Sequence, residues 1–186
     1  MMQQKEHLTQ KGLERIVSLK SPLNLGLSDL LKENFSNIVP AIRPLVVDQT
    51  IRDPQWVAGF ASGEGCFYVD TYKSKTKTGK AVKWIFYLTQ HSRDKELIKS
   101  LIEYFECGNI HFKNEEKVNF LVQRYSDITD KIIPFFKKYP IRGEKYKDFA
   151  DFCQVAELMK TKIHLTSEGF DKICSIKHGM NRGRQT

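Results

Sequence analysis

Glu64 is the residue whose surroundings most clearly suggest chemistry in this sequence. It stands between Gly63 and Gly65, at the end of an apolar stretch with the composition of a short helix. A carboxylate at a helix C-terminus opposes the negative end of the helix dipole, and a bound cation would offset that cost. Carboxylate and carbonyl oxygens are the ligands that Mg²⁺ prefers. We therefore predict that Glu64 and the Gly63 carbonyl bind Mg²⁺, the alternative being a solvated glutamate at a helix end.

The stretch before Glu64 has a clear helix start and many small residues. Asp53 precedes Pro54, an N-cap followed by proline at the first helical position. Small side chains let two helix backbones approach closely, although they give a helix little intrinsic stability. Such a helix gains its stability from a partner helix. The predicted helix-pairing residues are Ala58, Gly59, Ser62 and Gly63.

The other elements of the chain follow a regular order. Helical patterns occupy residues 54–65, 94–105, 126–138 and 146–163. Strand patterns occupy residues 66–73, 81–91, 108–113 and 118–125. The order αββαββα predicts an α+β fold with a four-stranded antiparallel sheet. Residues 73–80, which are rich in lysine, form the first hairpin loop.

Alternation along the strands assigns residues to the two faces of the sheet. The face toward the helices is predicted to carry Phe67, Val69, Phe86, Leu88, Phe120 and Val122. The opposite face is predicted to carry Tyr68, Asp70, Tyr72, Lys83, Tyr87, Thr89, Asn109, His111, Lys113, Asn119 and Gln123. So many hydrogen-bonding side chains suit the major groove of DNA, where each base pair has its own donor and acceptor pattern. In the hairpin loop, phosphate contacts are predicted for Lys73, Lys75, Lys77 and Lys80.

Bulk composition points the same way. The 186 residues carry a net charge of +8, with 40% hydrophobic residues, and the pI is near 9.3. Such a chain has enough apolar residues for a core, and its excess of lysine and arginine favours a polyanionic partner. The four cysteines lie far apart and predict reduced, buried thiols. No apolar run approaches the roughly 18 residues of a membrane span, so no membrane partner is expected.

A duplicated segment divides the chain. Residues 7–20 recur as residues 164–177, with His-Leu-Thr at the start of both copies. Thr9 and Thr166 are predicted N-caps of two similar helices. We therefore interpret residues 1–52 as an N-terminal helix and linker from the end of a preceding repeat, and residues 53–186 as the complete domain. Below, residues 7–20 are the N-terminal copy and residues 164–177 the C-terminal copy.

Taken together, the motifs resemble the LAGLIDADG homing-endonuclease family, in its fungal-mitochondrial branch. Residues 57–65, Val-Ala-Gly-Phe-Ala-Ser-Gly-Glu-Gly, fit the family motif position by position, and the Cys-Phe-x-Val of residues 66–69 follows. Residues 89–94, 132–136 and 143–149 match in the same order, so the resemblance covers essentially the whole chain. Ser62 stands where the family often has aspartate, but Glu64 keeps the required carboxylate.

The resemblance implies further roles and partners. It implies catalytic roles for Glu64, for Gln90 at the end of the second strand, and for Lys145 before the last long helix. It also implies a pair of motif helices at the metal site, which a homodimer or a missing first repeat would complete. The implied activity is Mg²⁺-dependent, sequence-specific cleavage of double-stranded DNA at an intron-insertion site, in mitochondria and encoded there.

Two other functions stay open on the sequence. The first is a non-catalytic protein that binds structured RNA, either as an intron maturase or as a scaffold in a mitochondrial ribonucleoprotein such as the mitoribosome. The second is a half-protein without activity of its own. Glu64 argues against the first, because a protein that only binds nucleic acid does not need that acid.

Overall fold

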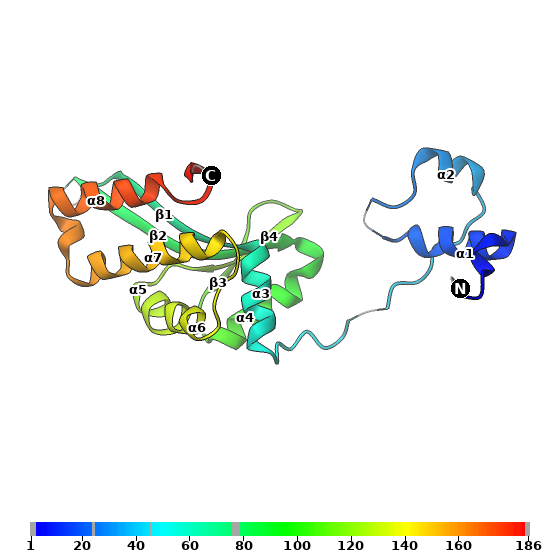
Figure 1. Ribbon diagram of the computed structural model, residues 1–186, viewed down its shortest axis with the longest axis horizontal. Helices are drawn as coiled ribbons and strands as arrows, with labels where there is room; N and C mark the ends of the chain where they lie inside the picture. Colours follow the sequence, from blue (N-terminus) through cyan, green and yellow to red (C-terminus); the bar gives the residue numbers. More distant parts are fainter. Residues whose placement is uncertain (1–2, 24, 45, 76–78, 185–186) are drawn as a thin grey trace. The chain divides into compact units, whose positions relative to one another are not determined.

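The computed structural model describes residues 3–23, 25–44, 46–75 and 79–184 of the chain (Figure 1). It consists of two compact units, Met1–Asp48 and Gln49–Thr186. The division lies close to the predicted boundary between residues 52 and 53. The larger unit holds the whole sheet and the helix that ends at Glu64.

The larger unit has the predicted α+β architecture. Its helices are α3 (Pro54–Glu64), α4 (Lys95–Phe105), α5 (Tyr125–Asp127), α6 (Ile133–Lys138), α7 (Lys145–Lys160) and α8 (Ser167–His178). Its strands are β1 (Gly65–Lys73), β2 (Lys80–His91), β3 (Asn109–Phe112) and β4 (Lys117–Val122). The strands form one antiparallel sheet in the order β1-β2-β4-β3. The order αββαββα is therefore confirmed from α3 to α6, and α7 and α8 follow it.

Local sequence explains where the elements begin and end. The Asp53 side chain accepts a hydrogen bond from the Gln55 amide at 2.8 Å, so it caps α3 as predicted. The helix predicted over residues 126–138 instead consists of α5, a π turn (Ile128–Ile132) and α6. Pro134 lacks an amide proton, so the regular helical hydrogen bond is unavailable there, which suits a wider turn. The last long helix ends at Lys160, three residues before its predicted end, and Lys162 takes the left-handed conformation with φ 59°.

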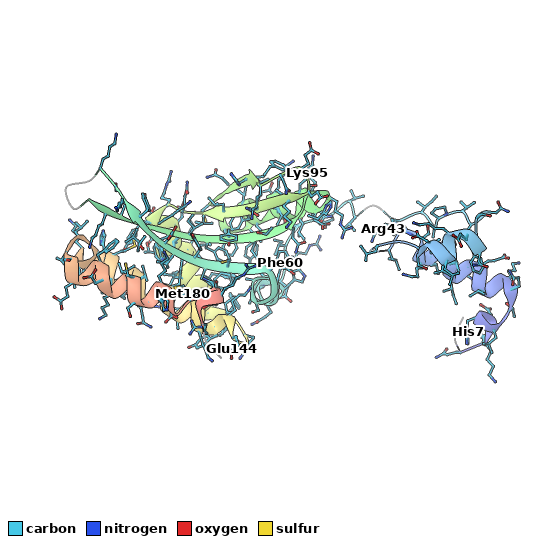
Figure 2. All side chains as sticks on the ribbon, turned by 90° about the horizontal axis from the view of Figure 1, so that it is seen from above. His7, Arg43, Phe60, Lys95, Glu144 and Met180 are labelled. Atoms are coloured by element: carbon cyan, nitrogen blue, oxygen red, sulfur yellow. The ribbon has the colours of Figure 1, made fainter. Side chains whose placement is uncertain are left out.

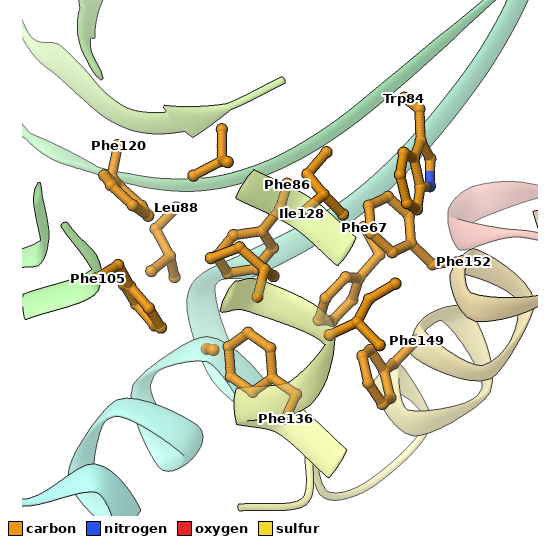
Figure 3. Close-up of a cluster of buried hydrophobic side chains, with 14 of the residues drawn as sticks. Phe67, Trp84, Phe86, Leu88, Phe105, Phe120, Ile128, Phe136, Phe149 and Phe152 are labelled. Carbon is orange, nitrogen blue, oxygen red and sulfur yellow. The ribbon is translucent and has the colours of Figure 1, made fainter. Parts of the chain in front are cut away.

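An aromatic core joins the sheet to the helices (Figure 3). Phe67 contacts four other phenylalanine rings, with centroid distances between 5.1 and 5.6 Å. All six residues predicted to face the helices are buried, with exposed fractions of 3% or less. The prediction of the sheet's two faces from alternation is confirmed on this side.

The C-terminal segment lies along β1 (Figure 1). Ile173 of α8 is completely buried, and the Asn181 side chain donates to the Phe67 carbonyl of β1 at 3.0 Å. The Asn181 amide also donates to Asp148 of α7 at 2.9 Å. In Figure 2, Met180 and the start of α7 at Glu144 accordingly lie on the same side of the molecule. Periodicity alone did not predict this packing of α8.

The smaller unit contains the N-terminal copy, in a turn at Glu6–Leu8 and in α1 (Gln10–Lys20), followed by α2 (Asp29–Asn34). Both copies have the same local structure. Thr9 accepts from the Gly12 amide at 3.0 Å and Thr166 from the Gly169 amide at 3.1 Å, so both predicted caps are confirmed. The residues that precede the two turns, Lys5 and Lys162, have φ values of 56° and 59°.

Both copies also require glycine at the same point. A Cβ on Gly12 would lie 1.8 Å from the Glu6 carbonyl oxygen, and one on Gly169 would lie 2.1 Å from that of Ile163. Only glycine therefore lets each helix begin so close to the turn before it. The duplication seen in the sequence extends to the backbone conformation.

Candidate functional site

Glu64 is the last residue of α3, and the chain passes directly from it into β1. This abrupt change needs glycine at position 65, since a Cβ there would lie 2.6 Å from the Ala61 carbonyl oxygen. The Glu64 side chain is exposed. Among the residues that the structure describes, none forms a hydrogen bond or ion pair with it. Its carboxylate is thus presented to solvent at the point where the helix meets the sheet.

Lys145 lies at the same point, although it is 81 positions later in the sequence (145 − 64). Its ammonium group donates to the Gly63 carbonyl at 3.0 Å and to the Gly65 carbonyl at 2.5 Å. It comes from the first residue of α7 and contacts the carbonyls on both sides of Glu64. The structure therefore brings together Glu64, Gly63 and Lys145. The Gly63 carbonyl, which is predicted to be a metal ligand, accepts a hydrogen bond from this lysine.

Gln90 lies near the same end of the sheet. Leu88 of β2 pairs with Gly65, and Gln90 continues β2 two residues farther, where it pairs with Val118 of β4. By alternation it shares the face of Leu88, the face that packs against the helices. Its side chain is half-buried. Gln90 and Glu64 thus lie at the same end of the domain, without a direct contact between their side chains.

The small residues of α3 fall into two pairs. A Cβ on Gly59 or Gly63 would meet nothing within 4 Å. Ala58, in contrast, is buried, and the Ser62 hydroxyl donates to the Ala58 carbonyl at 2.7 Å and accepts from the Arg142 amide at 3.0 Å. Ala58 and Ser62 therefore serve the packing of their own unit. The open side of α3 carries Gly59 and Gly63, beside the stacked rings of Trp56 and Phe60 at 5.0 Å.

The polar face of the sheet has the register expected from alternation. Asp70 pairs with Lys83, Thr89 with Asn119, and His111 with Asn119. Tyr68 and Tyr87 lie on the same face, with ring centroids 6.4 Å apart. Tyr72, Lys83, Asn109, His111, Lys113 and Gln123 are exposed.

Asn119 is the exception on this face. It is only 8% exposed, and its Oδ1 atom is buried without a hydrogen-bond partner in the described part of the chain. The strands on both sides of β4 cover it, so its side chain is not presented to a ligand in this conformation. At the end of the face, Asn109 and Gln123 line a hollow of about 450 Å³ together with Arg124.

The lysine-rich hairpin loop is described in part. Lys73 and Lys75 are exposed, whereas Lys77 lies outside the described residues. Lys80 is also exposed but contacts α8, with its ammonium group 3.8 Å from an Asp171 carboxylate oxygen and 4.6 Å from the centroid of the Phe170 ring. Its charge is therefore shared with the C-terminal copy.

Sequence reasoning did not identify two ion-paired residues of the C-terminal segment, Lys177 and Arg184. Arg184 lies 2.9 Å from the Asp148 carboxylate and 2.6 Å from that of Asp151, and Lys177 lies 2.6 Å from Asp70. These three ion pairs join residues that are far apart in the sequence, so no local spacing predicts them.

Hydrogen bonding and burial explain the directions in which several pKa values of this unit shift. The hydrogen bond from Lys177 is the main reason that the pKa of Asp70 lies below its ordinary value. Burial raises the pKa of the Cys66 thiol at the start of β1. Burial likewise raises the pKa values of the buried Cys107 and the half-buried Cys153 to about 11, so these thiols are protonated at neutral pH.

In the part of the chain that the structure describes, no group of three or more acidic, histidine or cysteine side chains lies close enough to hold a metal ion. Glu64 is thus not part of such a cluster among the described residues. None of the described helices is long and apolar enough to span a membrane.

Comparison with known proteins places this geometry in a family. "Probable intron-encoded endonuclease 3" of Neurospora crassa is 38% identical over 175 residues, which cover 93% of this chain and 33% of that protein. The solved structure of the LAGLIDADG homing endonuclease I-SmaMI bound to cleaved DNA has a TM-score of 0.95 at 47% identity, over 99% of this chain and 62% of the other. I-SmaMI bound to its uncleaved DNA target in the presence of calcium ions matches at a TM-score of 0.94 and 47% identity, over 98% of this chain and 63% of the other. This chain thus spans about a third to two thirds of the length of these relatives.

A family model described as LAGLIDADG endonuclease matches residues 57–156, from the open helix α3 through the sheet and most of α7. That range contains Glu64, Gln90 and Lys145 together with the polar sheet face. On this match, and on the fold that the solved relatives share with it, the chain belongs to the LAGLIDADG endonuclease family.

Proposed function

We propose that this chain forms one half of a sequence-specific, Mg²⁺-dependent endonuclease that cleaves double-stranded DNA at an intron-insertion site. The observation that carries this proposal is the exposed Glu64 carboxylate, with Lys145 bound to the carbonyls on both sides of it. A free acid held beside a lysine, at the end of a polar sheet face, suits hydrolysis of a phosphodiester better than binding alone.

The residues present fit a hard cation, as part of a larger site. Glu64 offers a carboxylate and Gly63 a carbonyl, and both are oxygen ligands that suit Mg²⁺. One carboxylate is too few for a closed site, so the remaining ligands must come from DNA phosphate, water and a second motif helix. When bound, the ion would supply Lewis-acid stabilisation of the charge that develops on the phosphate. Calcium in the I-SmaMI complex with its uncleaved target supports a divalent cation here.

Lys145 and Gln90 are proposed as the other catalytic residues. Lys145 carries a fixed positive charge where a phosphate would meet Glu64, and there it would stabilise developing negative charge. Its ammonium group has three N–H donors and uses two of them on the Gly63 and Gly65 carbonyls, so one remains for a phosphate oxygen. The Gly63 carbonyl likewise keeps a second lone pair for the cation. Gln90, at the same end of the sheet, is proposed to orient water.

The second carboxylate is proposed to come from another repeat. Gly59 and Gly63 leave the open side of α3 without side chains, so a second helix backbone can approach it closely. The partner is a missing first repeat, for which residues 1–52 would be the last segment, or a second copy of this chain. The first arrangement is favoured because the chain spans only 33% of its Neurospora relative and because its own N-terminal copy matches the end of the domain.

DNA is preferred to RNA as the ligand. The polar sheet face presents tyrosine, lysine, threonine, asparagine, histidine and glutamine side chains, which suit the base edges of the major groove. The I-SmaMI complexes contain DNA, which supports the same preference. The fungal intron-encoded relatives support a mitochondrial, organelle-encoded origin.

Cleavage of a randomised plasmid library, followed by sequencing of the new ends, tests the proposal. We expect ends to appear with Mg²⁺ when a second motif helix is present, from a second copy of the chain or from a first repeat joined to it, and to be absent with EDTA. Glu64→Gln should abolish cleavage and retain duplex binding, because an amide keeps the shape but is a poor Mg²⁺ ligand. Glu103→Gln, at an exposed glutamate of α4, is the matched control and should cleave normally.

Cleavage by Glu64→Gln at the wild-type rate would overturn the role of Glu64. Tighter binding to structured RNA than to duplex DNA would instead favour the maturase or scaffold function. A wild-type chain that binds duplex DNA but leaves it uncut with Mg²⁺ would show that cleavage requires the second motif helix in a larger protein.

A further inference from the structure

Asp70 is the only acidic side chain on the polar face of the described strands. A carboxylate on a surface that faces DNA repels the phosphates and so weakens binding. An acid there can hold a neighbouring basic side chain, and it can contribute to recognition if it accepts a hydrogen bond from a base. The hydrogen bonds that Asp70 already accepts therefore decide whether it can accept another from a base.

The hydrogen bonds of Asp70 leave one acceptor position on one defined atom. Its Oδ1 atom accepts from the Lys177 ammonium group at 2.6 Å and from the Thr71 amide at 2.8 Å. Its Oδ2 atom accepts from the Tyr68 hydroxyl at 3.1 Å. Each carboxylate oxygen has two acceptor positions, so Oδ1 is filled and Oδ2 has one left. The Asp70 side chain is 33% exposed, so a ligand can reach that position.

Lys177 gives this carboxylate a fixed orientation and offsets its charge. The lysine comes from α8, which is anchored by the buried Ile173 and by the contact of Asn181 with the Phe67 carbonyl. A charge-assisted hydrogen bond from an anchored helix holds an acid more firmly than solvent does. The lowered pKa of Asp70 and the raised pKa of Lys177 have this hydrogen bond as their main cause. The two groups thus stay charged at neutral pH.

Lys83 completes the arrangement from the neighbouring strand. It is the register partner of Asp70 in β2, lies on the same face and is exposed. In the major groove a C·G pair presents the cytosine N4 donor beside the O6 and N7 acceptors of guanine. An acid beside a lysine matches that pattern. Adenine presents its N7 acceptor next to its amino group, and that lone pair would repel a carboxylate.

We propose that Asp70 and Lys83 read one C·G base pair, with the free position of Asp70 Oδ2 accepting from cytosine N4, and that Lys177 of α8 is the positioning residue for Asp70. The inference rests on the proposed function, because it requires that this sheet face meets the major groove. It assigns a role in sequence specificity to α8, which lies outside the residues matched by the family model.

Selection from a pool of fully randomised DNA duplexes, at low salt, tests the inference with the full chain. We expect the wild-type sites to share a C·G pair that changes with the variant. Asp70→Asn should move the preference at that pair from cytosine toward adenine by about tenfold, since asparagine pairs with adenine N6 and N7 and a bidentate contact is worth about 1–3 kcal/mol. Lys83→Met should reduce the preference for guanine at the same pair and leaves the Asp70 hydrogen bonds intact.

Variants of α8 separate positioning from simple charge. Lys177→Met should broaden the base preference at that pair, whereas Lys177→Arg should restore it, because arginine can donate to Oδ1 in the same way. Lys172→Met removes an exposed lysine of the same helix and should leave the preference unchanged. A circular dichroism spectrum like that of the wild type shows that each variant is folded, and Lys83→Met carries the test if Asp70→Asn is not.

Unchanged preferences in Lys83→Met and in a folded Asp70→Asn would overturn the inference while leaving DNA binding intact. The same preference in Lys177→Met as in the wild type would remove the positioning role. A wild-type chain that enriches no sequence would overturn the role of the sheet in reading DNA, and this inference with it.

Discussion

The two copies of the duplicated segment share a backbone conformation but have different surroundings. In the C-terminal copy, Ile173 is completely buried, and Met180, just after the copy, is 4% exposed. Their counterparts 157 positions earlier are Ile16, which is half-buried, and Leu23, which is 47% exposed. The unit that holds the N-terminal copy has several other exposed apolar side chains: Leu8, Leu25, Leu30, Val39, Ile42, Val46 and Val47.

This difference distinguishes the local conformation that a short segment forms by itself from the burial that it gains by packing against another element. The threonine cap, the turn before it and the close approach of the glycine are local, and both copies form them. Burial of the apolar face, in contrast, requires another element to pack against, and α8 packs against β1. A helix of this length gains most of its stability from such packing. Within its own unit, the N-terminal copy thus has the local shape of the C-terminal copy and a less buried apolar face.

The largest expected effect comes from the buried isoleucine. Ile173→Ala should lower the free energy of unfolding by about 2–5 kcal/mol, because it leaves a cavity between α8 and the rest of the domain. Ile16→Ala, the matched change, should lower it by less than about 1 kcal/mol. Urea unfolding followed by circular dichroism measures both. Equal losses would mean that the N-terminal copy is packed as tightly as α8.

The paired glycines give a second contrast. Gly169→Ala should destabilise the larger unit by about 1–3 kcal/mol, since its Cβ would overlap the Ile163 carbonyl. Gly12→Ala has the same local clash with Glu6, yet it should reduce only the helical signal and leave the main urea midpoint in place. A shift of that midpoint by Gly12→Ala would show that the two units unfold together.

Arg184 has no counterpart in the N-terminal copy, where Leu27 occupies the equivalent position. Arg184→Met should cost about 1–3 kcal/mol, because Asp148 is 9% exposed and would lose a charged partner. The control is Arg182→Met, at an exposed arginine two residues earlier. Equal urea midpoints for the two variants would contradict a structural role for the Arg184 ion pairs.

The smallest expected effect is that of Lys177→Met, about 0.2–1 kcal/mol, because its ion pair with Asp70 is partly exposed. The folded-state pKa of Asp70 lies below its ordinary value of 3.8, so its stabilisation is complete above that pH and is lost as the pH falls through the folded-state pKa. The difference between wild type and Lys177→Met should therefore be constant from pH 7 to 5 and shrink below pH 4. Lys20→Met, the matched change, should show no such dependence, and a constant difference down to pH 3 would contradict the pairing.

Much of the fold was predictable because its signals are local. Asp53 and Pro54 mark the start of α3, and alternation places Phe67 and Asp70 on opposite faces. The contacts of Lys145 with two carbonyls, and of Arg184 with Asp148, join residues at least 36 positions apart, for which periodicity carries no information. The burial of Asn119 escaped prediction for a related reason, since alternation gives the face of a residue but not how its neighbours cover it. The roles of Glu64, Gln90 and Lys145 in the reaction stay predictions.

The position of α8 also bears on solubility. The sheet has two edge strands, β3 with four residues and β1 with nine. A long uncovered edge can recruit a strand from another molecule, whereas a short one offers little to extend. Because the C-terminal segment occupies the β1 side and donates to its Phe67 carbonyl, the longer edge is closed to such recruitment. A chain that loses its last helix would therefore be expected to polymerise edge to edge.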